Sequence, residues 1–149
     1  MFEFAGGDAA FLDLATAFHK RCLEDPVLNH PFSHNGNPRH IENLAAYWAE
    51  VFGGPARYSE VLGGHSGMLV IHAGQGGGHD LGDRFAACFM QAADDARLPD
   101  DPELRAGLRT YIEWAVREVV SYALAEARVQ PGLAIPRWSW NGLERVPDR

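Results

Sequence analysis

Basic residues, cysteines and long apolar runs are all scarce in this sequence. Its 149 residues include 13 Lys and Arg against 20 Asp and Glu, so the formal net charge is -7 with histidine neutral. The basic residues are scattered and form no stripe, which argues against a nucleic-acid-binding protein. No apolar run approaches the roughly 20 residues that cross a bilayer, and the N-terminus lacks the basic start and apolar stretch of a signal peptide. We therefore expect a cytoplasmic protein without a nucleic-acid or membrane partner.

The two cysteines, Cys22 and Cys88, show no CxxC spacing. Each falls on an apolar row of a predicted helix, which favours buried, reduced side chains over metal ligands or a disulfide bridge. Hydrophobic residues make up 46% of the chain and charged residues 22%, which is ordinary for a globular protein. The length allows one domain with a substantial core.

Helical periodicity dominates and the alternation typical of strands is scarce, so we predict an all-α fold. A first long helix should end at Asp25-Pro26, because proline disfavours helical backbone at the residue before it. A second should begin near Pro38 and end at Gly53-Gly54-Pro55. The first helix carries apolar residues at steps of three and four, namely Phe11, Leu14, Ala15, Phe18 and Cys22.

Three further helices are predicted in the second half of the chain. Between Ser59 and Ala73 we expect a short helix with Met68, Leu69 and His72 on one face. Gly63, Gly64 and Gly67 leave its start open, and Met68-Leu69-Val70-Ile71 also fits a short strand. Residues 81–96 form the next, and the last runs from Pro102, with Asp101 as cap, to about Arg128. Beyond Pro131 the prolines exclude a helix, and two tryptophans favour docking of this tail on the body. We therefore divide the chain into a domain at 1–130 and a C-terminal extension at 131–149.

Several of the seven histidines are candidate ligands. His65, His72 and His79 are seven residues apart, a spacing that suggests zinc on a continuous helix. The glycine run at residues 74–78 should break such a helix before His79, so zinc is disfavoured. That run also lacks the GK[ST] ending of a phosphate-binding loop, which favours a simple connection.

His72 stands on a short element, and His40 faces it from a longer helix across an apolar space. A haem protein needs this arrangement, because one imidazole binds the iron and the opposite face stays open or is guarded by a distal side chain. Periodicity alone leaves two possibilities equally open for His72: an iron ligand, or a buried imidazole bonded to backbone. His19 continues the row of Phe11 and Ala15 and so borders the buried face of the first helix.

Beyond these patterns, the sequence resembles the truncated haemoglobins, and its details are similar to the second group of that family. The likeness covers about residues 3 to 127, and GGP-x-x-YSE followed by a histidine about a dozen residues later is its most specific part. The residues that carry it are Gly6-Gly7, Phe18, Glu24-Asp25-Pro26-Val27-Leu28, Phe32, Leu44 to Trp48, Phe52-Gly53-Gly54-Pro55, Tyr58-Ser59-Glu60, Gly64-His65 and His72-Ala73.

The resemblance implies a two-over-two helical sandwich around haem b, with His72 as the proximal iron ligand. It implies that Phe32 lies against the haem and that His40 is the distal residue. Leu44 and Tyr47 then follow His40 at successive turns of the same helix.

Two positions depart from the family pattern. The tyrosine that the family usually has directly after Phe18 is replaced by His19. The tryptophan that the second group usually has at the start of the helix after the proximal histidine is replaced by Phe85, which has no hydrogen-bond donor. The pocket should therefore depend on imidazoles, each of which donates one N–H when neutral.

This resemblance implies a protein that reversibly binds O₂, CO or NO. Oxygen handling, NO detoxification and peroxide-linked chemistry are all open, the last two with an unidentified reductase or donor, so an enzymatic role is undecided. Two alternatives stay open: a haem-based sensor or interaction module that signals through the tail, and a globin scaffold that has lost haem.

Overall fold

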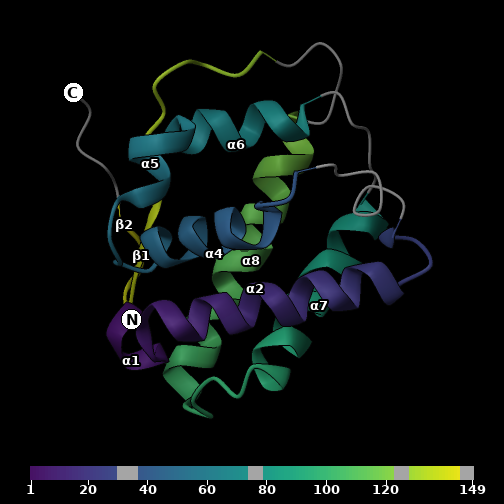
Figure 1. Cartoon of the computed structure of the whole chain (residues 1–149), viewed down its shortest axis with the longest axis vertical. Helices are drawn as coiled ribbons and strands as arrows, with labels where there is room; N and C mark the ends of the chain where they lie inside the picture. The colour runs from purple at the N-terminus through teal and green to yellow at the C-terminus, as the bar shows by residue number, and fades with distance from the viewer. Residues whose placement is uncertain (30–36, 74–78, 123–127, 145–149) are drawn as a thin grey trace.

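The computed structural model describes residues 1–29, 37–73, 79–122 and 128–144 (Figure 1). None of the described helices is long and apolar enough to cross a membrane. The helices are α1 (Phe2–Ala5), α2 (Gly7–Glu24), α4 (His40–Val51), α5 (Arg57–Leu62), α6 (Gly64–His72), α7 (His79–Asp95) and α8 (Pro102–Tyr122), and they are followed by strands β1 (Arg137–Ser139) and β2 (Gly142–Glu144).

Two pairs of helices form the body of the molecule. Helix α2 packs on α4, α7 packs on α8, and the two pairs meet through contacts between α2 and α7. Helices α5 and α6 lie beyond α4 (Figure 1), and α6 also contacts α8. The predicted all-α, two-over-two sandwich is confirmed, with a two-stranded hairpin as its one described addition.

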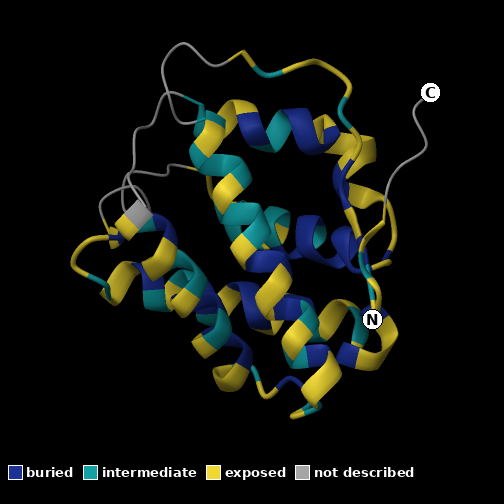
Figure 2. Cartoon of the chain, turned by 180° about the vertical axis from the view of Figure 1, so that it is seen from behind, coloured by how far each residue is buried: buried dark blue, intermediate teal, exposed yellow. Residues whose placement is uncertain are grey.

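The core between these helices is mainly aromatic. Phe18 of α2 packs edge-to-face on Trp48 of α4, with ring centroids 5.2 Å apart, and Trp48 packs in the same way on Phe89 of α7 at 4.9 Å. Phe89 in turn contacts Tyr111 of α8 at 6.1 Å. Edge-to-face pairs of this kind are favoured by the ring quadrupole. Figure 2 shows the buried residues on the faces that the helices turn toward one another.

The predicted end of α2 and the predicted start of α8 are confirmed, and an aspartate lies at each boundary. After α2, the Asp25 carboxylate accepts hydrogen bonds from the backbone N–H groups of Val27 and Leu28 at 2.8 and 3.0 Å. Before α8, the Asp101 carboxylate accepts one from the N–H of Leu104 at 2.9 Å. Asp101 thus caps the N-terminus of α8, where the first N–H groups have no helical carbonyl to bond, whereas Asp25 stabilises the turn that follows α2.

The short helix expected between Ser59 and Ala73 is α6, and a separate helix, α5, precedes it. Helix α5 ends at Leu62, and α6 begins at Gly64 after Gly63, which has a left-handed φ of 80°. The chain then folds back so tightly that a Cβ on Gly67 would lie 2.2 Å from the carbonyl oxygen of Leu62. The glycines that left the start of the expected helix open therefore act as a break between α5 and α6. The alternative strand at Met68–Ile71 is wrong, since those residues belong to α6.

A buried carboxylate fixes the start of α5. Glu50, 6% exposed at the end of α4, accepts hydrogen bonds from the backbone N–H of Ser59 at 3.0 Å and from the Ser59 hydroxyl. The serine of the YSE motif therefore ties α5 to α4 across the Gly53-Gly54-Pro55 turn.

Other boundaries shift by a few residues. Helix α7 begins at His79, two residues before the predicted start, and the described part of α8 ends at Tyr122. Arg128 lies outside any helix, and the predicted end of α8 near that residue falls where residues 123–127 lie outside the description. Both cysteines are free and buried, as expected, and burial raises the pKa of the Cys22 and Cys88 thiols.

The tail docks on the body through a β-hairpin that the sequence did not predict. Strands β1 and β2 pair antiparallel with Trp138 opposite Leu143. Trp138 is buried and contacts Tyr111 and Trp114 of α8, with ring centroids 5.7 and 5.9 Å away. Trp140 packs edge-to-face on Phe4 of α1 at 5.2 Å. The expected docking of the two tryptophans is therefore confirmed.

Candidate functional site

His72 ends α6 in an orientation that suits a metal ligand. Its Nδ1 lies 2.9 Å from the carbonyl oxygen of Met68, one turn earlier in the same helix. Because a carbonyl only accepts, Nδ1 must carry the proton, and in the neutral ring Nε2 then keeps its lone pair. A hydrogen bond from the other ring nitrogen to a backbone carbonyl is what fixes the tautomer of metal-binding histidines. The half-buried His72 therefore presents the nitrogen donor that haem iron takes.

Two further imidazoles come together near this one. His19 of α2 and His40 of α4 have ring centroids 5.3 Å apart, with the planes tilted by 55°. Burial lowers the pKa of His40 below the usual histidine value, and positive charge on His19 and on His72 lowers it further. His40 therefore lies within electrostatic reach of both other histidines and stays neutral at neutral pH.

The three imidazoles come from three different helices. Figure 1 shows that the start of α4, the end of α6 and the second half of α2 all lie on one side of the molecule. The structure thus brings the proximal candidate, His72, near both distal candidates, His19 and His40. His19 and His72 are 53 positions apart in the sequence.

Apolar side chains border the same region. Phe85 of α7 packs edge-to-face on Phe18 at 4.7 Å and is half-buried. Leu44 of α4 is also half-buried and packs against the core. Both supply hydrocarbon surface without a donor, as the sequence predicted for Phe85. Phe32, the predicted contact from the loop, lies outside the described residues.

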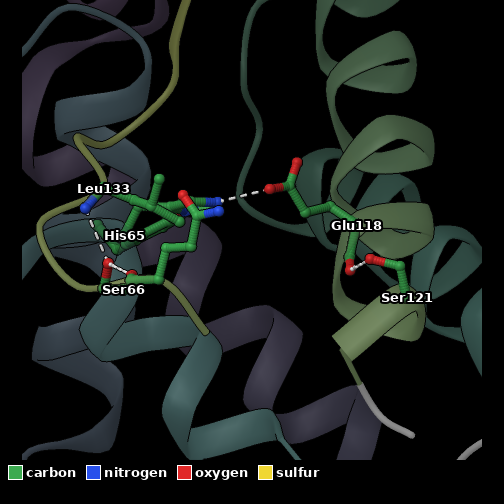
Figure 3. Close-up of polar contacts among 7 residues, drawn as sticks. His65, Ser66, Glu118, Ser121 and Leu133 are labelled. Carbon is green, nitrogen blue, oxygen red and sulfur yellow. Dashed lines mark hydrogen bonds and ion pairs between the residues drawn. The ribbon is translucent and has the colours of Figure 1, made fainter. Parts of the chain in front are cut away.

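Tyr47 points away from the predicted group, toward α6. Its hydroxyl lies 2.7 Å from Nδ1 of His65, while Nε2 of His65 lies 3.0 Å from a carboxylate oxygen of Glu118 on α8. Figure 3 shows Glu118 reaching from α8 toward His65. Both ring nitrogens of His65 are thus engaged inside the protein, so His65 offers no free donor to a metal.

A zinc site gains no support. Within the four described ranges, no group of three or more His, Cys, Asp or Glu side chains is placed to hold a metal ion. The side chain of His79, the third histidine of the seven-residue series, lies outside what the structure describes.

Glu118 is a residue that the sequence analysis missed. It stands between Ala115 and Tyr122 in the row of α8 that faces the core, where the other positions are apolar or aromatic. A carboxylate at such a position was the available signal, because charged residues are rarely buried without a partner. The partner, His65, lies 53 residues earlier and could not be identified from spacing.

Comparisons with known proteins identify the family and the fold. The family model described as bacterial-like globin matches residues 1–118. A thermostable haemoglobin from the actinobacterium Thermobifida fusca is similar, with 29% identity and a TM-score of 0.66 over 80% of this chain and 94% of that one. A triple mutant of ASV-TfTrHb has 30% identity and a TM-score of 0.66, over 80% of this chain and 90% of that chain. No curated protein matches the sequence.

Proposed function

Since this chain belongs to the bacterial-like globin family, which confirms the predicted truncated haemoglobin, we propose that it binds haem b through His72. The observation that carries this proposal is the bond of 2.9 Å between His72 Nδ1 and the Met68 carbonyl, which leaves Nε2 for iron. When bound there, haem supplies an iron that binds O₂, CO or NO reversibly.

In this proposal, His40 and His19 orient the ligand on the distal side. His40 is held neutral by its surroundings, so one nitrogen donates a hydrogen bond and the other accepts. Leu44 and Phe85 keep water from the pocket, and the role of Phe32 against the haem stays a prediction. We assign no ligand contact to Tyr47, because its hydroxyl is bonded to His65.

The physiological role we propose is reversible binding of a diatomic ligand in the cytoplasm. NO detoxification or peroxide chemistry would add a need for electrons from a reductase or another donor. Membership of the second group of truncated haemoglobins also stays a prediction from the residues after Phe18 and around Gly53-Gly54-Pro55.

An absorption spectrum of the purified chain, ferric and ferrous, with and without CO, tests the proposal. The wild type should show a Soret band after haem addition that shifts with CO, and His72→Ala should lose stable iron ligation. His65→Gln, on the same helix, is the matched control and should keep the wild-type spectrum. A wild-type spectrum in His72→Ala would contradict the assignment, and no Soret band in any sample would favour a globin scaffold that has lost haem.

A second candidate function is a haem-based sensor that signals through the tail. The observation in its favour is a set of hydrogen bonds, here called the tether, that joins Gln130 and Leu133 of the tail to Ser66 and His65 of α6. The Ser66 hydroxyl donates to the Gln130 carbonyl at 2.6 Å and accepts from the Leu133 N–H at 2.8 Å, and the His65 N–H donates to the Leu133 carbonyl at 3.2 Å (Figure 3). Deleting residues 131–149 separates the two functions: altered ligand kinetics would mean that the tail gates the pocket, and loss of partner binding alone would mean that it signals.

A further inference from the structure

A buried chain of three polar side chains crosses the molecule between α4, α6 and α8. Tyr47 and His65 are 5% and 4% exposed, and their bond joins the phenol oxygen to Nδ1 at 2.7 Å. The other ring nitrogen of His65 lies 3.0 Å from Glu118, whose side chain is 24% exposed. The proposed haem site uses none of these three groups.

The direction of each hydrogen bond follows from the chemistry of the partners. An ionised carboxylate only accepts, so Nε2 of His65 carries the proton that faces Glu118. In the neutral ring, Nδ1 is then the acceptor, and the Tyr47 O–H donates to it. A base oriented by a carboxylate and in contact with an O–H group is the arrangement that prepares an O–H group to lose its proton.

Burial restricts what this arrangement can do. Desolvation raises the pKa of Tyr47 well above the usual tyrosine value, so a free phenolate is not formed at neutral pH. The side chain is also enclosed by its neighbours, including Tyr58 with a ring centroid 5.1 Å away, so no substrate reaches its oxygen. Loss of an electron together with the proton remains open to it, because an electron needs no direct access.

We propose that Tyr47 is a redox-active tyrosine whose phenolic proton moves to His65 when the ring is oxidised. Tyr47 gives one electron to a one-electron oxidant, and its O–H bond breaks as an N–H bond forms at His65 Nδ1. The products are a neutral tyrosyl radical, a reduced oxidant and a His65 imidazolium that faces the Glu118 carboxylate. Return of one electron moves the proton back to the phenol oxygen and restores the starting state.

The pair lies close to the candidate haem site. Tyr47 follows His40 by seven residues on α4, and His65 precedes His72 by seven residues on α6. Seven residues of helix span about 10 Å, or two turns. If His72 holds haem, a one-electron oxidant supplied at that site would therefore be a neighbour of Tyr47. That source of oxidant rests on the proposed function, whereas the chemistry of the pair does not.

Aromatic rings continue from this pair toward the tail. Trp114 of α8 stacks on His65 with centroids 6.3 Å apart and an angle of 23°, and Trp138 lies 5.9 Å from Trp114. The buried Nε1 of Trp138 has no acceptor among the described residues, so an oxidised Trp138 would keep its proton. These rings give an oxidising equivalent a path from Tyr47 to the C-terminal hairpin.

The test uses the full-length chain and hexachloroiridate(IV), a one-electron oxidant that needs no haem. Electron paramagnetic resonance of freeze-quenched samples should show a neutral tyrosyl radical in the wild type. The signal should disappear in Tyr47→Phe, which keeps the ring, and persist in Tyr58→Phe. Tyr58 is the matched control because it is equally buried, at 5% exposure, yet makes no bond to an imidazole within the described residues. A radical that persists in Tyr47→Phe overturns the proposal.

A second pair of variants decides the question if Tyr47→Phe fails to fold. Glu118→Gln leaves the tyrosine and the histidine in place but removes the negative charge that stabilises the imidazolium, so the radical yield should fall. Glu113→Gln, at an exposed position of the same helix, should match the wild type. Equal yields in the two variants would refute the role of the pair. Failure of the proposed function is detected separately, by the Soret band.

Discussion

Removing the Ser66 hydroxyl should loosen the tail from the helix that carries His72. This hydroxyl is the only side-chain group in the described tether between residues 130–133 and α6, and it serves as donor to Gln130 and acceptor from Leu133 at once. Ser66 itself is 8% exposed. Ser66→Ala therefore leaves two backbone groups without a protein partner.

The structure sets the size of the effect. Gln130 is exposed, so its carbonyl can bind water in the variant. The N–H of Leu133 is half-buried and less able to bind water, so the loss of its hydrogen bond accounts for more of the decrease in stability. A buried polar group left unpaired costs about 1 to 3 kcal/mol, and we expect about 2 kcal/mol here. With a urea dependence of about 2 kcal/mol per molar, the unfolding midpoint should fall by about 1 M.

Urea unfolding and amide hydrogen exchange measure this prediction together. The Leu133 amide should lose protection in Ser66→Ala, while amides in the middle of α8 keep theirs. Ser121→Ala is the control, because Ser121 donates only to the carbonyl of Glu118 within its own helix and is exposed. Substitution there should change stability by less than about 0.5 kcal/mol. Unchanged Leu133 exchange together with an unchanged midpoint would show that Ser66 does not hold the tail.

Three further predictions concern the histidines and the turn before α6. His40→Leu should speed O₂ dissociation from the haem-loaded protein more than His19→Leu, measured by stopped flow; wild-type rates in both would exclude a ligand contact. Because the pKa of His40 is lowered in the fold, the unfolded chain binds its proton first, so stability should fall as pH drops below about 6.5. Urea unfolding of the haem-free protein between pH 5 and 8 should show this slope, and a slope that is the same in His40→Gln would assign it to another group. Gly67→Ala should lower the melting temperature strongly, since its Cβ would meet the Leu62 carbonyl at 2.2 Å; an unchanged melting temperature would mean that the turn can open at little cost.

Periodicity was sufficient to locate the long helices. The apolar row from Phe11 to Cys22, the Asp25-Pro26 pair and the cap Asp101 are local signals, and the structure confirms them. The break between α5 and α6 also had a local signal in Gly63, but its effect depends on the left-handed backbone that the fold imposes there. Strands of three residues are too short to show alternation, so the hairpin at residues 137–144 was missed.

The candidate site was only partly predictable for a different reason. A helical row tells which residues share a face but not which residue of another helix they meet. Tyr47 shares a face of α4 with His40, so the sequence predicted both in one pocket. In the structure, the register of α4 against α6 places the Tyr47 hydroxyl in contact with His65 instead. Glu118 completes that pair from α8, at a distance along the chain that no spacing rule connects.

Helices α4 and α6 run in opposite directions, and this arrangement links the two sites. Each carries its pair of polar residues seven positions apart, so His40 lies within electrostatic reach of His72 at one end and Tyr47 contacts His65 at the other. A shift of α6 along its axis would therefore move His65 and His72 together, changing the bond to Tyr47 and the position of the candidate iron ligand in the same step. The tail is tethered at Ser66 and at the His65 N–H, next to the first of these histidines. Any partner or substitution that releases the tail should then be detected in both places, as a lower tyrosyl radical yield and as altered ligand kinetics. A change in one without the other would show that α6 bends between His65 and His72 and does not move as a rigid unit.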